Sequence, residues 1–261
     1  MKHKLNKDWW KYIFDELYLL TDSRSVCDQS LTRQEVDFIG QFVEQNKEAA
    51  ILDLCGGQGR HSLELSRRGF TDITVLDYSS YLINLGKEQA MKENLEVNFI
   101  RGDARDTGLE AGQYRYIILM AGSFGYFIEI EENTRILKEI SRLLSQRGRV
   151  LLDLPDRDYC MDHFQPFSSF AVDRDVTVER HRETDNDIVY CREIVRSSGK
   201  GVLRDSVYCI RLFTPALINS LLTEAALTPV SLSHGFMDRQ SSGDYGCMTN
   251  RQIVIAEKIT G

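Results

Sequence analysis

Three aspartates, each placed where an apolar segment ends, could together hydrogen-bond the donor groups of a single bound molecule. Asp53 lies in Ile-Leu-Asp-Leu just before a glycine-rich turn at 56–59, Asp77 ends Ile-Thr-Val-Leu-Asp, and Asp103 follows Phe-Ile-Arg-Gly. A carboxylate can accept hydrogen bonds from both hydroxyls of a cis-diol, and such charge-assisted bonds are among the strong ones. The pattern predicts one ligand with an amino-acid end, a ribose diol and an adenine, but without phosphates.

The glycine-rich turn lets a ligand approach the backbone closely, because glycine has no side chain and tolerates left-handed conformations. A dinucleotide-binding fold also places its ligand against such a turn, which makes the Gly-x-Gly-x-x-Gly fingerprint the relevant comparison. Counted from Gly57, the last glycine position of this fingerprint is occupied by Ser62. The mismatch argues against a nicotinamide dinucleotide as the ligand.

An alternation of strands and helices is needed to bring the three aspartates to one edge of a sheet. Apolar periodicity switches between 2 and 3.6 residues along this part of the chain, which is typical of a parallel sheet covered by helices on both faces. We expect strands at 49–54, 73–77, 96–101, 115–121 and 149–154, helices at 58–68, 80–93 and 131–146, and later a helix at 215–226 and strands at 228–234 and 252–257.

Two further parts of the chain accompany this alternation. Apolar residues within 7–20 recur at spacings of 3, 4 and 7, which predicts one amphipathic helix. Thr32, with Glu35 three residues later, predicts a second helix that begins with a capping box.

Late in the chain, charged alternating segments around Asp-Asn-Asp predict a β-hairpin followed by a third strand. The strands expected there are at 176–184, 188–196 and 203–212.

The three aspartates and the glycine-rich turn together resemble class I S-adenosylmethionine-dependent methyltransferases, over roughly residues 47–156 and 213–258. The resemblance implies an α/β, Rossmann-like, doubly wound mixed sheet. Two positions depart from the family pattern: Cys55 stands where glycine is commonest, and Arg115 stands where an acid often precedes the fourth strand. The domains expected are an N-terminal helical lid at 1–46, a cofactor-binding core at 47–156, a small antiparallel β insertion at 157–212 and a C-terminal completion of the core at 213–261.

By the same resemblance, the cofactor is S-adenosyl-L-methionine and the product is S-adenosyl-L-homocysteine. The family's roles place Asp53 near the amino group of the methionine part, Asp77 at the ribose hydroxyls and Asp103 at the adenine amino group. The expected cofactor-binding residues are Asp53, Cys55, Gly56, Gly57, Gly59, Asp77, Tyr78, Gly102, Asp103, Ala104, Met120 and Ala121.

The segment Ser-Phe-Gly-Tyr at 123–126 resembles one that lines the junction of cofactor and acceptor in small-molecule methyltransferases. Enzymes that methylate adenine amino groups usually carry Asn/Asp-Pro-Pro-Tyr there, and that motif is absent. Tyr18 and Tyr126 are the candidates for the acceptor side of catalysis, with aromatic packing of the lid on the core as the alternative for both. The expected substrate-binding residues are Phe124, His163, Arg180 and Arg211, for which core packing or a solvated strand position is the alternative.

These features predict methyl transfer from S-adenosylmethionine to a nitrogen or oxygen of a small-molecule acceptor by in-line displacement. Holding the acceptor close to the methyl group supplies much of the acceleration of such a reaction. The insertion resembles those of glycine and sugar-amine N-methyltransferases, which favours nitrogen. The alternatives are RNA or protein methylation, aminopropyl transfer in the same pocket, and a cofactor-binding protein without methylating activity.

The composition of the chain argues against several classes of binding partner. The chain has 261 residues and a net charge of −7, so a large basic surface for nucleic acid is not expected. Its six cysteines and five histidines are scattered without metal-ligand spacing, and no metal site is expected. No run approaches the ~18 apolar residues of a membrane span. We expect a cytoplasmic protein without a membrane partner, and a homodimer is compatible with the insertion, where related enzymes place oligomer contacts.

Overall fold

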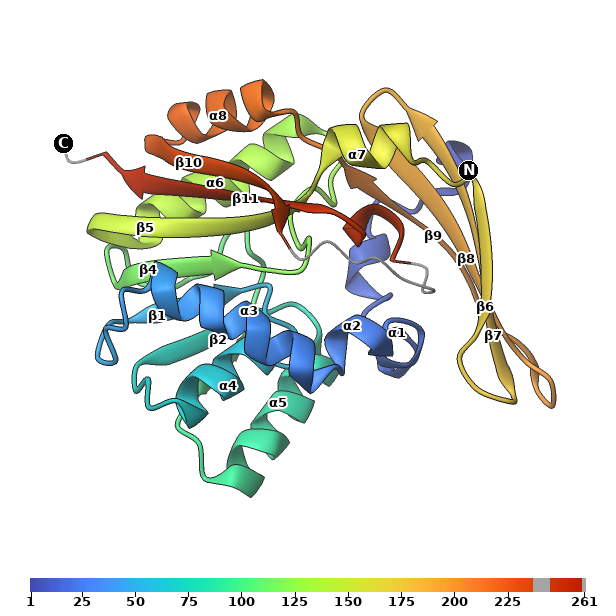
Figure 1. The fold of residues 1–261 in the computed structure, drawn as a ribbon, viewed down its shortest axis with the longest axis horizontal. Helices are drawn as coiled ribbons and strands as arrows, with labels where there is room; N and C mark the ends of the chain where they lie inside the picture. Colours follow the sequence, from blue (N-terminus) through green and yellow to red (C-terminus); the bar gives the residue numbers. More distant parts are fainter. Residues whose placement is uncertain (237–244, 260–261) are drawn as a thin grey trace.

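The computed structural model describes residues 1–236 and 245–259, and two β-sheets organise them (Figure 1). The larger sheet contains β1 (Ile51–Leu54), β2 (Ile73–Asp77), β3 (Asn98–Arg101), β4 (Tyr114–Leu119), β5 (Leu144–Pro155), β10 (Leu227–Phe236) and β11 (Arg251–Lys258). Its strand order is β10-β11-β5-β4-β1-β2-β3. The pairs from β5 to β3 are parallel, whereas β11 runs antiparallel to both β5 and β10.

Helices cover both faces of the larger sheet. They are α3 (Gln29–Phe42), α4 (Arg60–Arg67), α5 (Ser80–Glu93), α6 (Ile130–Leu143) and α8 (Pro215–Glu224). Side chains of α3 and α4 pack with Ile51, Ile73 and Ile118, whereas α6 and α8 pack with Leu52 and Leu119 from the same strands. Successive strand residues point to opposite faces, so each central strand is apolar almost throughout. The predicted fold class, an α/β doubly wound mixed sheet, is confirmed.

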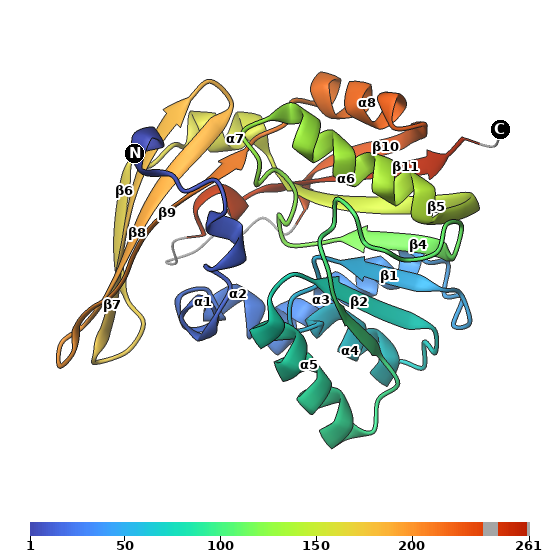
Figure 2. The same cartoon turned by 180° about the vertical axis from the view of Figure 1, so that it is seen from behind.

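The second sheet stands beside the carboxyl ends of the parallel strands (Figures 1 and 2). It is antiparallel throughout, in the order β6-β7-β8-β9. Its strands are β6 (Phe167–Ala171), β7 (Val176–Asp185), β8 (Ile188–Ser197) and β9 (Gly201–Arg211). The predicted hairpin and third strand are β7, β8 and β9. The first strand, β6, and the short helix α7 (Arg157–Asp162) lack the strong alternation or length that would have predicted them.

The N-terminal segment lies between the two sheets (Figures 1 and 2). It contains the 3₁₀ turns η1 (Lys2–Lys4) and η2 (Trp9–Lys11) and the short helices α1 (Glu16–Thr21) and α2 (Ser23–Val26). The prediction of one helix over 7–20 is therefore wrong. The carboxylate of Asp15 accepts hydrogen bonds from Leu17 N at 2.9 Å and Tyr18 N at 3.2 Å, so it caps a new helix where the expected one would continue.

The start of the next helix also differs from the prediction. Asp28, not Thr32, caps α3, because its carboxylate accepts hydrogen bonds from Ser30 N at 2.8 Å and Leu31 N at 3.0 Å. Thr32 lies inside the helix and donates its hydroxyl to the Asp28 carbonyl at 2.8 Å. The expected capping box is absent, since Glu35 is fully buried in an ion network. Helix α6 is shorter than predicted because Leu144 already pairs with Tyr114 at the start of β5.

A 3₁₀ turn, η3 (Gly246–Met248), precedes β11. Across the ranges 1–236 and 245–259, no helix has both the length and the apolar composition that crossing a bilayer requires.

Candidate active site

Two neighbouring cavities lie at the carboxyl ends of the parallel strands. The smaller one, of about 80 Å³, is lined by the turn after β1 and by the ends of β2 and β3, and we call it the aspartate cavity. The larger one, of about 170 Å³, lies between the N-terminal segment and the antiparallel sheet, and we call it the sheet cavity. Because Phe14, Tyr18 and Tyr126 line both, the cavities meet at these three rings.

The turn after β1 carries three left-handed residues: Cys55 with φ 59°, Gly57 with φ 59° and Gly59 with φ 70°. Gly57 lines the aspartate cavity. Gly59 is required by packing, since a Cβ there would lie 2.7 Å from the ring of Phe99. Gly56 similarly packs on the carboxylate of Asp53, which a Cβ would approach to 2.6 Å. Only one of the three glycines predicted from the turn therefore faces the cavity.

Asp77 joins the turn to the end of β2. Its carboxylate accepts hydrogen bonds from Gly57 N at 2.9 Å and Ser79 N at 2.8 Å, which holds it at the cavity wall. Burial raises the pKa of Asp77 despite these bonds. A buried carboxylate of this kind gains further from hydroxyl donors on a ligand.

Asp103 occupies the other side of the aspartate cavity. Burial acts to raise the pKa of Asp103, but the ion pair with Arg105, at 2.6 Å, outweighs it and holds this pKa below its usual range. Asp103 is thus an ionised acceptor at neutral pH. Four other expected cofactor residues also line this cavity, namely Cys55, Tyr78, Gly102 and Ala104.

Asp53 is placed differently from the other two aspartates. It is fully buried beneath the turn and lines neither cavity. Its Oδ2 accepts a hydrogen bond from the Ser62 hydroxyl at 2.8 Å, while Oδ1 has no partner within the described part of the chain. Burial raises the pKa of Asp53 to about 7. Three further expected cofactor residues, Gly56, Gly59 and Met120, lie outside both linings, and Ala121 lines the sheet cavity.

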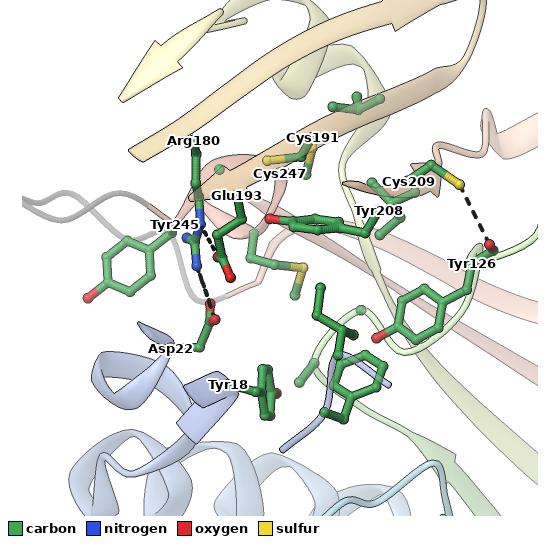
Figure 3. A pocket seen from close by; sticks show the side chains of 18 of the residues that line it. Tyr18, Asp22, Tyr126, Arg180, Cys191, Glu193, Tyr208, Cys209, Tyr245 and Cys247 are labelled. Atoms are coloured by element: carbon green, nitrogen blue, oxygen red, sulfur yellow. Dashed lines mark hydrogen bonds and ion pairs between the residues drawn. The ribbon is translucent and has the colours of Figure 1, made fainter. Parts of the chain in front are cut away.

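One wall of the sheet cavity carries buried ion pairs (Figure 3). Glu193 accepts from Arg180 Nε at 2.9 Å and from Arg204 Nη1 at 3.3 Å. Arg180 also donates to Asp22 Oδ2 at 3.0 Å, and Arg204 pairs with Asp15. Because Asp15 and Asp22 belong to the N-terminal segment, these pairs connect that segment to the antiparallel sheet.

The junction of the cavities is aromatic. The rings of Phe14 and Tyr126 stack with centroids 5.6 Å apart, and the ring of Tyr18 meets Phe14 edge-on at 5.0 Å. Burial raises the pKa of the Tyr18 and Tyr126 hydroxyls well above the usual value. Both phenols are therefore neutral at physiological pH, so they can orient an acceptor by hydrogen bonds but are poor bases.

The four residues predicted to bind substrate are dispersed in the structure. Arg180 lines the sheet cavity. Phe124 is fully buried in the core, with its ring 5.0 Å from that of Phe213. His163 stacks on Tyr159 at 4.1 Å, and Arg211 donates to the Ile128 carbonyl. Phe124, His163 and Arg211 line neither cavity.

Several residues that the sequence reading did not select line the site: Trp9, Trp10, Glu193, Arg204 and Tyr208. Trp10 belongs to the apolar face of the helix expected at 7–20, whereas Trp9 does not. The pair of adjacent tryptophans was a signal that this segment packs against another part of the molecule. Glu193 lies on β8, and Arg204 and Tyr208 lie on β9. Polar and apolar residues alternate along these strands, and which face is covered depends on where the N-terminal segment packs.

Asp153, at the end of β5, holds the loop that follows β4. Its Oδ2 accepts from Ala121 N at 2.8 Å and from Arg251 Nη1 at 2.6 Å. Arg251 also donates to Glu35 Oε1 at 2.7 Å. Ala121 lines the sheet cavity and has a left-handed φ of 57°. A fully buried ion network thus fixes the backbone between the two cavities.

Comparison with known proteins supports the sequence resemblance. Residues 51–148 match the family model of the methyltransferase domain. A putative methyltransferase, YqeM of Bacillus subtilis, is 26% identical over 157 residues, 59% of this chain and 62% of that protein. Glycine/sarcosine N-methyltransferase of Halorhodospira halochloris is 27% identical over 135 residues, 51% of this chain and 50% of that protein. The chain therefore spans only about half to three fifths of these relatives.

The fold has counterparts among solved structures. An S-adenosylmethionine-dependent methyltransferase from Clostridium acetobutylicum superposes with a TM-score of 0.74 and 17% identity, covering 94% of this chain and 97% of that one. The match includes most of both chains, so it extends beyond the core to the N-terminal segment and the antiparallel sheet. At this identity, the similarity establishes the fold.

Proposed function

We propose that this chain, whose residues 51–148 match the family model of the methyltransferase domain, transfers the methyl group of S-adenosyl-L-methionine to a nitrogen of a small molecule. The observation that carries the proposal is the junction of the two cavities at Phe14, Tyr18 and Tyr126. Molecules bound in the two cavities would therefore face one another beside these rings. That arrangement suits direct transfer of a group between two bound molecules.

The residues of the aspartate cavity fit the adenosyl part of the cofactor. Asp77 is a buried carboxylate held by two backbone N–H groups, and it would accept from the ribose hydroxyls. Asp103, ionised beside Arg105, would accept from the adenine amino group. Gly57 leaves the turn open at the cavity wall. The bound cofactor would supply an electrophilic methyl group on a sulfonium, and the product would be S-adenosyl-L-homocysteine.

The chemistry of the sheet cavity supports a nitrogen acceptor. Its two lining carboxylates, Asp22 and Glu193, are both paired with Arg180. Its tyrosines near the junction are neutral because burial raises their pKa. An alcohol acceptor usually needs a base to remove its proton, whereas a neutral amine already has a lone pair for attack. The similarity to a glycine/sarcosine N-methyltransferase points in the same direction.

The dimensions of the sheet cavity support a small acceptor. Its volume is about 170 Å³, and the N-terminal segment and the antiparallel sheet both contribute to its lining, so it suits a small acceptor held between two elements. The net charge of −7 gives no attraction to RNA. We therefore favour a small-molecule amine over the macromolecular alternatives.

The direct test is transfer of radiolabel from S-adenosyl-L-[methyl-³H]methionine to a panel of amines and to the matching alcohols. We expect labelled product with at least one amine, and equal formation of S-adenosyl-L-homocysteine. Labelling of alcohols alone would overturn the choice of nitrogen. Failure of the protein to bind S-adenosyl-L-homocysteine in calorimetry would overturn the proposed function as a whole.

A further inference from the structure

A continuous wall of five aromatic rings lines the sheet cavity beside the junction. Three rings come from the N-terminal segment, one from the loop after β4 and one from β9. The residues are Trp9, Phe14, Tyr18, Tyr126 and Tyr208. Figure 3 shows the three tyrosines around one space, with Tyr18, Tyr126 and Tyr208 entering it from three different elements.

The rings contact one another in sequence. Tyr208 lies 5.7 Å from Trp9, which lies 5.1 Å from Tyr126, between ring centroids. Tyr126 lies 5.6 Å from Phe14, which lies 5.0 Å from Tyr18. These spacings lie within the range of favourable aromatic pairs. The wall is therefore one surface and not a set of isolated side chains.

The charged groups of the cavity lie on another wall and have partners there. Glu193 and Asp22 pair with Arg180, and Glu193 also accepts from Arg204. Arg182 donates through Nη1 to the Ser168 hydroxyl at 3.0 Å, and Ser168 does not line the cavity. Among the described residues, the two carboxylates that line the sheet cavity are thus engaged by arginines, and a cation beside the wall would meet aromatic rings and neutral tyrosine hydroxyls.

Aromatic faces attract cations through the ring quadrupole, and alkylated ammonium groups are the ligands best suited to such a surface. An ammonium with several N–H groups loses hydrogen bonds to water that rings cannot replace. An N-alkylated ammonium has few or no N–H groups. Its positive charge is spread over the alkyl groups, which can contact the rings directly. We therefore expect such a wall to favour ammonium groups that carry more alkyl groups on nitrogen.

We propose, on the basis of the proposed function, that the acceptor is an N-alkylated amine and that the aromatic wall holds the more highly alkylated ammonium product. The nitrogen lone pair forms the new N–C bond as the C–S bond breaks, and the bonding electrons stay on sulfur. The positive charge passes from sulfur to nitrogen. Because Phe14, Tyr18 and Tyr126 line both cavities, aromatic rings border the path along which the charge moves. A tertiary amine gives a quaternary ammonium, and a secondary amine afterwards releases one proton to solvent.

A pair of probes that differ only in charge tests the inference. Choline and 3,3-dimethylbutan-1-ol have nearly the same shape, but only choline is a cation. We expect the protein, saturated with S-adenosyl-L-homocysteine, to bind choline about 3- to 30-fold more tightly than the neutral alcohol, the range for a cation–π contact. Calorimetry or saturation-transfer NMR measures both. Equal affinity for the two probes, or binding of neither, would overturn the inference.

Tyr208 provides matched variants, because it lines the sheet cavity but not the aspartate cavity. Tyr208→Phe keeps the ring and should keep the preference for choline. Tyr208→Leu removes the ring and should lower that preference several-fold. Binding of S-adenosyl-L-homocysteine reports that each variant is folded. If the wild-type protein does not bind S-adenosyl-L-homocysteine, the proposed function is refuted. If it binds S-adenosyl-L-homocysteine but shows no preference for choline over the neutral alcohol, only the inference about the acceptor is refuted.

Discussion

Asp53 is a buried carboxyl group with one unpartnered oxygen among the described residues, and it links folding to pH. Burial raises the pKa of Asp53 to about 7, compared with about 3.9 in an unfolded chain. Between these two values the unfolded chain has lost the proton and the folded chain has kept it. The contribution of Asp53 to stability is therefore present below about pH 4 and is lost as the pH rises to about 7.

Asp53→Asn removes this ionisation while keeping the shape of the side chain. We expect the variant to gain stability relative to wild type on going from pH 5 to pH 8, by about 2–3 kcal/mol. Urea unfolding at the two pH values measures the difference. The control is Asp72→Asn, at an exposed position just before β2, which should show no such dependence. A gap between wild type and Asp53→Asn that is the same at both pH values would contradict the assignment.

Asp77 is the residue on which cofactor binding should depend most. Asp77→Asn keeps a side-chain oxygen at the cavity wall but removes the charge that strengthens its hydrogen bonds to hydroxyl donors. We expect binding of S-adenosyl-L-homocysteine to weaken by about 1–3 kcal/mol, as measured by calorimetry. Asp72→Asn, at the opposite end of β2, should leave the affinity unchanged. If both variants bind alike, Asp77 does not contact the ligand.

The positions of the three aspartates show what residue-level reasoning could predict. Asp77 is the last residue of β2 and Asp103 lies just after β3. The carboxyl ends of these strands share an edge of the sheet, and both aspartates line the aspartate cavity. Asp53 has one more strand residue after it, and its side chain lies on the α4 side, where Ser62 bonds it. The spacing predicted which residues would come near the turn. The direction of each side chain depends on the residue at which its strand ends. The sequence pattern locates that end only to within about one residue, and a shift of one residue turns a side chain to the opposite face.

At the scale of elements, ion pairs hold the N-terminal segment, which we expect to act as a lid, to the antiparallel sheet. Asp15 caps α1 and also pairs with Arg204, whose side chain is only 7% exposed. Asp22 pairs with Arg180. On the side of the aspartate cavity, the Ser79 hydroxyl donates to the Phe14 carbonyl at 2.6 Å. The segment is thus attached on both sides of the junction.

Asp15→Asn keeps the cap on α1 but leaves the buried guanidinium of Arg204 with fewer charged partners. We expect the free energy of opening the lid to fall by about 1–3 kcal/mol, because the buried charge of Arg204 loses part of its compensation. The lid should therefore open more often. Hydrogen exchange of residues 9–26 measures this opening. Asp8→Asn is the control, since Asp8 pairs only locally with Lys11 at 2.9 Å. Equal exchange in the two variants would show that the pair does not hold the lid.

The same contacts explain why strands were predicted better than the N-terminal helices. The strands of the larger sheet are short apolar runs, and burial on both faces is enough to define them. The helix expected at 7–20 had suitable periodicity, but Asp15 ends it by bonding backbone N–H groups beyond it. The partner that favours this arrangement, Arg204, lies on β9. A contact so distant in sequence leaves no local pattern.

At the scale of the whole molecule, one buried ion network connects the helical layer, the sheet and the loop that follows β4. Glu35 on α3 pairs with Arg251 on β11 at 2.7 Å and accepts from His61 on α4 at 2.9 Å. Arg251 in turn bonds Asp153, which holds Ala121 beside the cavities. Burial acts to raise the pKa of Glu35, but the surrounding cations outweigh it and hold this pKa below its usual range. Glu35 is therefore charged at neutral pH, with its stabilising contribution present above about pH 4 and lost as the pH falls.

Sequence reasoning predicted the overall architecture but not this network. Glu35 was expected to complete a capping box, because its spacing from Thr32 matches that motif. In the structure it is fully buried between the helical layer and the sheet. The sheet order brings β11 next to β5, and only that pairing places Arg251 within reach of both acids. The fold had to be known before the network could be recognised.

Glu35→Gln tests how much the molecule depends on this network. The substitution keeps the size of the side chain but leaves Arg251 and Arg60 with less buried negative charge, so we expect a loss of about 3–5 kcal/mol in the free energy of unfolding at pH 7. Glu44→Gln is the matched control, because Glu44 is 58% exposed and pairs with Arg149 at the surface, where a pair contributes less than about 1 kcal/mol. Urea unfolding measures both. If the two variants lose similar stability, the buried charges do not support the fold. If Glu35→Gln is strongly destabilised but excess S-adenosyl-L-homocysteine raises the unfolding temperature of the variant and of wild type equally, the network supports the scaffold without shaping the binding site.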